Sequence, residues 1–188
     1  LEMLRTGEID CAILAEPFPD TGLAIAPLYD EPFLAAVPST HPLAQQESIS
    51  TQQLKNETML LLGAGHCFRD HVLEVCPEFA RYASNAEGIR RSFEGSSLET
   101  IKHMVAAGMG VTLVPRLSVA NDALQSPRRR RSDEPYIRYL PIVEPDGSAP
   151  PKRRVSLVWR RSFTRYEAIA ALRNAIHACK LLGVERLN

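Results

Sequence analysis

Residues 96–115 read Ser-Ser-Leu-Glu-Thr-Ile-Lys-His-Met-Val-Ala-Ala-Gly-Met-Gly-Val-Thr-Leu-Val-Pro, and this stretch predicts one helix followed at once by one strand. The two serines favour a helix start, and Glu99 in the first turn strengthens it. Helical spacing continues to Ala107, and Gly108 ends the helix. The apolar run at 111–115 is then typical of a buried strand.

The same order of strand and helix continues on both sides of this stretch. Apolar runs predict further strands at 9–14, 33–37, 58–62, 89–93, 136–142 and 154–159, the first of them buried on both faces. Caps and helical spacing predict helical segments at 1–7, 50–54, 66–75, 117–124 and 164–182. This alternation indicates an α/β fold with a mostly parallel sheet. Ligands in such sheets bind beyond the carboxyl ends of strands, where the loops at 63–67 and 95–97 are expected.

The composition is that of a folded globular protein, with 45% hydrophobic and 23% charged residues in a chain of 188. The 22 basic and 22 acidic residues give a formal net charge of zero, so nothing overall attracts nucleic acid. No apolar run reaches the roughly 18–20 residues of a membrane span and no leader is recognised, so we expect a cytoplasmic protein without membrane contact. Residues 1–7 resemble the last turn of a helix, which predicts a fragment that starts inside a fold.

The four cysteines are too few and too unevenly spaced for a disulfide scaffold or a zinc pair, so no metal is expected. Cys11 and Cys179 lie in apolar patterns and are interpreted as small buried hydrophobic residues. Cys67 stands at the predicted start of a helix, where free amides and the helix dipole favour a thiolate. Peroxide converts a thiolate to a sulfenic acid, which a second cysteine captures, and Cys76 is the candidate.

The spacing of Cys67 and Cys76 constrains that disulfide. Nine residues of helix separate them by ~13 Å of rise and turn them onto opposite faces. A disulfide requires Cα atoms within about 7 Å, so oxidation must unwind residues 66–76. The plainer alternative is that both are ordinary free cysteines. His71, one turn after Cys67, is interpreted as a surface histidine rather than a ligand.

Several stretches carry a family resemblance. They are Gly65-His66-Cys67-Phe68-Arg69-Asp70 with Cys76 nine residues after Cys67, Ser97-Leu98-Glu99-Thr100, residues 104–115, residues 4–11 and residues 29–32. The last four resemble the effector domains of LysR-type transcriptional regulators. The first resembles the redox segment of the peroxide-sensing members of that family.

This resemblance implies two Rossmann-like α/β lobes in a periplasmic-binding-protein-like arrangement, joined by two crossover strands. Lobe I would hold residues 1–30 with 154–188, and lobe II, with the redox segment, residues 31–153. It also implies that Cys67 is the peroxide-reactive thiol and Cys76 its resolving partner. The implied peroxide pocket and thiolate contacts are made by His66, Arg69, Asp70 and Arg154.

The resemblance further implies a regulator that is not an enzyme and needs no cofactor. Its implied partners are hydrogen peroxide, further copies of itself in a dimer or tetramer, RNA polymerase, and glutaredoxin or thioredoxin as reductant. Promoter DNA would be bound by a winged helix-turn-helix domain, which this sequence lacks together with a linker helix and the first strand and helix of lobe I. The run Arg128–Arg131 is longer than the family pattern and is interpreted as a solvated loop.

Three other functions fit parts of the pattern. The first is a LysR effector domain that binds an organic metabolite, with Ser97 and Thr100 holding a carboxylate at a helix start. The second is a thiol peroxidase that turns over with thioredoxin. The third is a periplasmic solute-binding protein, which the lack of a leader disfavours.

Overall fold

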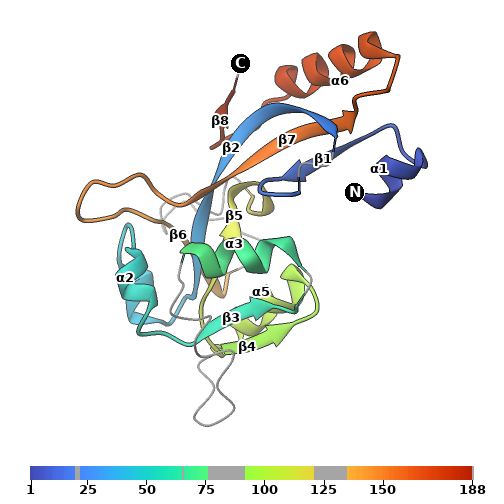
Figure 1. Cartoon of the computed structure of the whole chain (residues 1–188). Coiled ribbons are helices and arrows are strands. Elements are labelled where there is room, and N and C mark those ends of the chain that lie inside the picture. Colours follow the sequence, from blue (N-terminus) through green and yellow to red (C-terminus); the bar gives the residue numbers. More distant parts are fainter. Residues whose placement is uncertain (20–21, 65, 76–91, 121–134, 188) are drawn as a thin grey trace. The chain divides into compact units, whose positions relative to one another are not determined.

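The computed structural model describes residues 1–19, 22–64, 66–75, 92–120 and 135–187. These residues form two compact units (Figure 1). Unit 1 comprises Leu1–Pro32 and Lys152–Asn188, and unit 2 comprises Phe33–Pro151. The chain therefore passes between the units twice, at 32–33 and at 151–152, where the sequence predicted 30–31 and 153–154.

Unit 1 is a sheet with one helix on each face. Its elements are α1 (Glu2–Thr6), β1 (Cys11–Ala15), the first part of β2 (Leu23–Pro38), β7 (Lys152–Arg160), α6 (Tyr166–Ala178) and β8 (Glu185–Arg186). Strand β7 runs antiparallel to both β1 and β2, and β8 pairs with β2. Neighbouring residues of a strand point to opposite faces. Accordingly Val158 packs with Leu4 of α1, whereas Leu157 packs with Ile169 of α6.

Strand β1 is less buried than its apolar sequence predicted. Ile13 is 51% exposed, and no residue of β1 is fully buried. Among the described residues β1 pairs only with β7, so it stands at an edge of the sheet. The prediction of a strand buried on both faces was therefore wrong, because composition does not distinguish a central strand from an edge strand.

Unit 2 carries the larger core. Its elements are the second part of β2, a 3₁₀ turn (Pro42–Gln45), α2 (Thr51–Leu54), β3 (Met59–Leu62), α3 (Cys67–Val75), β4 (Ser92–Gly95), α5 (Leu98–Ala106), β5 (Thr112–Pro115), a 3₁₀ turn (Arg116–Ser118) and β6 (Ile137–Pro141). Strand β2 pairs antiparallel with β5 and with β6, and β3 pairs parallel with β4. A parallel bridge joins Met59 to Val111 at the start of β5.

Most described strand pairs are antiparallel, whereas the alternation of strands and helices predicted mostly parallel ones. The parallel expectation holds for β3 and β4, each of which leads into a helix. It fails for β2, which crosses between the units as an extended segment, and for β7, which lies in unit 1. Neither needs a helical crossover to meet its neighbours, so antiparallel pairing is open to them.

The predicted helix starts and ends are largely confirmed. Ser50 caps α2 in a reciprocal capping box with Gln53, and Gly7 ends α1 with a left-handed φ of 85°. The helix predicted at 117–124 is wrong in its described part, because a 3₁₀ turn ends at Ser118 and Val119 is extended. Residues 89–91 of the predicted strand at 89–93 lie outside the described residues. No helix in the described part of the chain is long and apolar enough to cross a membrane.

Candidate redox site

One edge of unit 2 holds part of the predicted site, the segment around Cys67 and the start of α5. Strands β3 and β4 are parallel neighbours, and Leu62 at the end of β3 pairs with Gly95 at the end of β4. Helix α3 begins five residues after Leu62, and α5 begins three residues after Gly95 (Figure 1). Because the carboxyl ends of parallel strands meet at one edge of a sheet, both helices present their N-termini there. This is the edge that the sequence predicted for ligand chemistry.

Cys67 is the first residue of α3 and its side chain is exposed. The amides of a first helical turn have no partner within the helix, and the helix dipole places partial positive charge there. His66 and Asp70, on either side of Cys67 in sequence, are exposed as well. The arrangement thus offers an accessible sulfur at a helix N-terminus.

Arg69 ties the first turn of α3 to the preceding strand. Its Nη1 donates a hydrogen bond of 2.8 Å to the carbonyl oxygen of Leu62. The backbone amide of Arg69 also donates to the carbonyl of His66, at 2.9 Å. The family resemblance implied Arg69 only as part of the peroxide pocket, and the sequence gave no sign of this bond. The guanidinium closes the loop between β3 and α3, and so fixes where the helix starts.

His71 is buried, which corrects its interpretation as a surface histidine. Its ring lies 6.4 Å from the ring of Phe33 on β2 and 6.5 Å from the ring of Phe68 on α3. The rings of Phe33 and Phe68 meet edge to face at 5.4 Å. Phe68 and Val72, three residues before His71 and one after it, are also buried. This apolar face of α3 could have been found from the helical spacing, which places His71 beside those two residues.

Ser97 and Thr100 lie at the same edge, where their side chains stabilise the start of α5. The hydroxyl of Ser97 accepts a hydrogen bond of 3.1 Å from the backbone amide of Thr100. The two hydroxyl oxygens are 3.0 Å apart and share a second hydrogen bond. These contacts form an N-cap, which explains both residues without a bound carboxylate.

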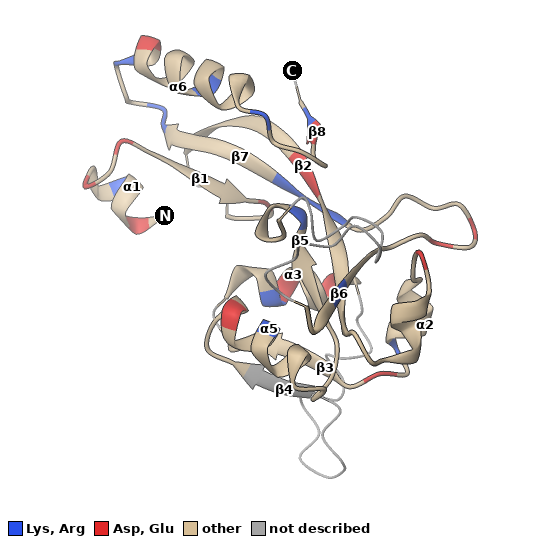
Figure 2. Cartoon of the chain, turned by 180° about the vertical axis from the view of Figure 1, so that it is seen from behind, with Lys and Arg blue, Asp and Glu red and all other residues tan. Residues whose placement is uncertain are grey.

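Arg154, on β7 in unit 1, belongs to an ion-pair group centred on Asp30 of β2. Figure 2 shows basic residues in blue on β7 and acidic residues in red on β2. Its Nε and Nη2 donate to the two carboxylate oxygens of Asp30, at 2.8 and 3.1 Å. Lys152 reaches Asp30 at 2.7 Å and Glu185 at 3.0 Å. The hydrogen bond from Arg154 is the main reason that the pKa of Asp30 falls from 3.8 to about 2, although burial opposes the change. The expected approach of Arg154 to Cys67 stays a prediction.

The lowered pKa of Asp30 predicts an acid-sensitive contribution to folding. Since the folded-state pKa lies below the unfolded one, the stabilisation is complete above about pH 4 and fades as the pH falls towards 2. We expect Asp30→Asn to lower the free energy of unfolding at pH 7 by roughly 1–2 kcal/mol. Urea unfolding followed through the fluorescence of Trp159, the single tryptophan, measures this.

The control for this prediction is Asp10→Asn in the same unit. The Asp10 side chain is exposed and meets Arg160 only at 3.9 Å, so its removal should leave the unfolding free energy almost unchanged. If Asp30→Asn lowered the free energy of unfolding by the same amount at pH 3 as at pH 7, this result would contradict the assignment.

Two of the predicted features lie outside the described residues: Cys76, and the arginine run at 128–131. The other two cysteines belong to unit 1, whereas α3 belongs to unit 2. Cys11 is half-buried in β1, and Cys179 is exposed at the C-terminal end of α6, where its sulfur contacts the carbonyl of Ala175. Cys179 was thus wrongly expected to be buried.

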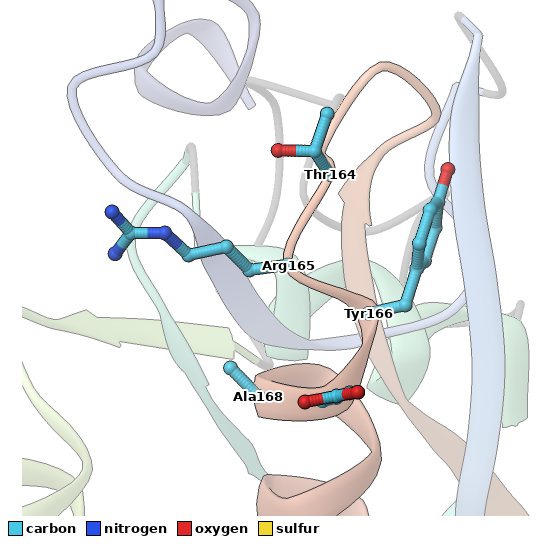
Figure 3. A pocket seen from close by; sticks show the side chains of 5 residues that line it. Thr164, Arg165, Tyr166 and Ala168 are labelled. Carbon is cyan, nitrogen blue, oxygen red and sulfur yellow. The ribbon is translucent and has the colours of Figure 1, made fainter.

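A pocket of about 570 Å³ lies at the start of α6 and contains none of the predicted residues. Its lining comes from a single stretch, residues 164–168. Figure 3 shows the side chains of Thr164, Arg165 and Tyr166 pointing in different directions. Such a surface lacks the convergent polar groups of a binding site.

Comparison with known proteins defines the class. The family model of the LysR substrate binding domain matches residues 1–179, so the chain belongs to the LysR substrate-binding domain family. The expected fold class, an α/β domain of two periplasmic-binding-protein-like lobes, is thereby confirmed.

Within this class the chain is similar to OxyR proteins. It is 38% identical over 173 residues to a hydrogen peroxide-inducible genes activator of Pectobacterium carotovorum, covering 90% of this chain and 51% of the relative. It is 37% identical over 173 residues to the DNA-binding transcriptional dual regulator OxyR of Escherichia coli K12, covering 90% and 50%. A structure of a reduced form of OxyR from N. meningitidis matches with a TM-score of 0.84 and 35% identity, covering 100% and 80%. The chain thus spans about half the length of the curated relatives it matches.

Proposed function

We propose that this chain is the regulatory domain of a LysR-type transcription regulator that senses hydrogen peroxide through a reversible disulfide between Cys67 and Cys76. The observation that carries the proposal is the exposed Cys67 at the first residue of α3. The similarity to OxyR proteins supports it. Unit 1 would act as lobe I and unit 2 as lobe II, which contains the redox segment.

The chemistry has two steps. In the first, the thiolate of Cys67 attacks one peroxide oxygen, so that an S–O bond forms, the O–O bond breaks, and the departing hydroxide takes up a proton. In the second, the sulfur of Cys76 attacks the sulfenic acid, an S–S bond forms, and water leaves. Two thiols and one peroxide thereby become one disulfide and two waters, with no cofactor. His66, Arg69 and Asp70 would line the peroxide pocket, and Arg154 would stabilise the thiolate.

Helix α3 makes the second step conformational. The helix is continuous from Cys67 to Val75, and its two ends are separated by ~12 Å of rise. Cys76 directly follows Val75 in the sequence. A disulfide between Cys67 and Cys76 needs their Cα atoms to lie within about 7 Å of each other. The helix must therefore unwind before the bond can close, and this refolding is the proposed signal.

The whole regulator would act through further partners. Promoter DNA, RNA polymerase, sister subunits in a dimer or tetramer, and a glutaredoxin or thioredoxin reductant belong to this proposal, as does a cytoplasmic location. The formal net charge of zero fits a domain that leaves DNA contact to another part of the protein. A regulator of this kind is not an enzyme, so oxidation should be a single event per molecule rather than a turnover.

Peroxide titration of the reduced chain tests the proposal. We expect substoichiometric peroxide to yield one Cys67–Cys76 disulfide by peptide mass spectrometry, and amide exchange to show residues 66–75 losing protection. Continued peroxide consumption with thioredoxin would indicate a thiol peroxidase instead. A chain that forms no disulfide, or forms it with unchanged amide exchange at α3, would refute the proposed switch.

A further inference from the structure

Three rings join α3 to β2 inside unit 2. Phe33 on β2 is 2% exposed, and Phe68 and His71 on α3 are 8% and 5% exposed. The edge-to-face contact of Phe33 with Phe68, at 5.4 Å and 81°, is a favoured aromatic geometry. His71 completes the group, with its ring 6.4 and 6.5 Å from the other two. We call Phe33, Phe68 and His71 the ring cluster.

The ring cluster has one fixed side and one that must move. Phe33 pairs with Pro115 of β5, and its amide donates to the carbonyl of Pro151 at 3.0 Å. It is therefore held in the sheet whatever α3 does. Phe68 directly follows Cys67, and His71 comes one turn later on the same face of the helix. Unwinding of α3 from Cys67 onward must first pull these two rings away from Phe33.

His71 adds a third buried ring to the contact between Phe33 and Phe68. Replacing it with a smaller side chain would reduce the contact area that is buried against these two rings. The three rings together therefore set how firmly the cluster holds α3.

We propose that the ring cluster is a latch that sets how fast the disulfide closes after Cys67 has been oxidised. The inference rests on the proposed function, and it assigns Phe33, Phe68 and His71 as positioning residues for the second step. None of them supplies an atom to either reaction. The first step takes place at the exposed Cys67 while α3 is still helical, so the latch leaves it unchanged. The second step needs the helix to open, so the latch limits its rate.

Two kinetic measurements separate these steps. Sulfenic acid at Cys67 is trapped with dimedone for the first step, and the disulfide is quantified by mass spectrometry for the second. Phe68→Leu removes the edge-to-face contact and should speed closure roughly tenfold, with the first step unchanged within about twofold. His71→Ala removes the third ring and should also speed closure, with the first step unchanged. This second variant keeps the test decisive even if Phe68→Leu folds poorly.

Leu54→Ala is the matched control. Leu54 is fully buried in the core of unit 2, on α2, and has no part in the ring cluster. It should lower stability without changing the rate of closure. Equal effects of Leu54→Ala and Phe68→Leu, or identical closure rates in all variants, would overturn the latch. Absence of any disulfide in the unmodified chain would instead overturn the proposed function.

Discussion

Cys67→Ser should abolish disulfide formation with hydrogen peroxide. Serine keeps the size and the helix start but removes the only atom of residue 67 that peroxide oxidises under mild conditions. The remaining cysteines then lack a partner activated at a helix N-terminus. Mass spectrometry after one equivalent of peroxide should detect no disulfide that is sensitive to reductant, whereas Cys76→Ser should accumulate a trappable sulfenic acid at Cys67.

Cys179→Ser is the control for this prediction. Cys179 is exposed like Cys67, but it lies at the C-terminal end of α6, where the helix dipole disfavours an anion. Its replacement should leave the disulfide yield unchanged, and its alkylation should be slower than that of Cys67. Faster alkylation at Cys179, or a disulfide that persists in Cys67→Ser, would show that helix position does not select the reactive thiol.

Gly110→Ala should destabilise unit 2 more than other single methyl additions. A Cβ at Gly110 would lie 2.4 Å from the carbonyl oxygen of Thr58, and 3.2 Å from Cγ of Leu60. The first contact is with backbone, which cannot rotate away. That same carbonyl accepts the amide of Val111 at 2.9 Å, so relief of the clash disrupts the bridge between β3 and the start of β5. We expect a loss on the order of 3 kcal/mol in unfolding free energy.

Gly63→Ala is the control for this prediction. Among the residues that the structure describes, its Cβ would meet only the carbonyl oxygen of Gly95, at an ordinary 3.8 Å. Denaturant unfolding followed by circular dichroism should place this variant within about 1 kcal/mol of the unmodified chain. Similar midpoints for the two alanine variants would contradict the argument from close approach.

The sequence predicted local elements better than long-range partners. The start of α5 at its serine cap and the extent of α3 could both be read from caps and spacing. The first ten residues of β2 could not, because Pro27, Pro32 and the adjacent acidic residues are typical of a loop. In the structure they pair with β7, and Asp30 and Glu31 contact Arg154 and Arg153 on that strand. Such pairing is a property of the fold and leaves no local pattern.

For the site, too, the sequence predicted local features but not long-range contacts. The sequence placed Cys67 at a helix start and at the edge of a sheet, since both follow from neighbouring residues. It did not predict that Arg69 binds the Leu62 carbonyl or that His71 packs against Phe33. Each of those contacts depends on the direction of a side chain across a loop or onto another strand.

Strand β2 has its register fixed twice, once in each unit. Its first half is aligned with β7 as far as Pro32, and its second half with β5 and β6 from Phe33 onward. One residue inserted or deleted near this point would exchange the two faces of β2 from Phe33 onward, where every residue is buried, because side chains alternate along a strand. The return connection at 145–150 is exposed throughout and has no such constraint. Natural variation in chain length should therefore accumulate in the return connection and be absent from β2.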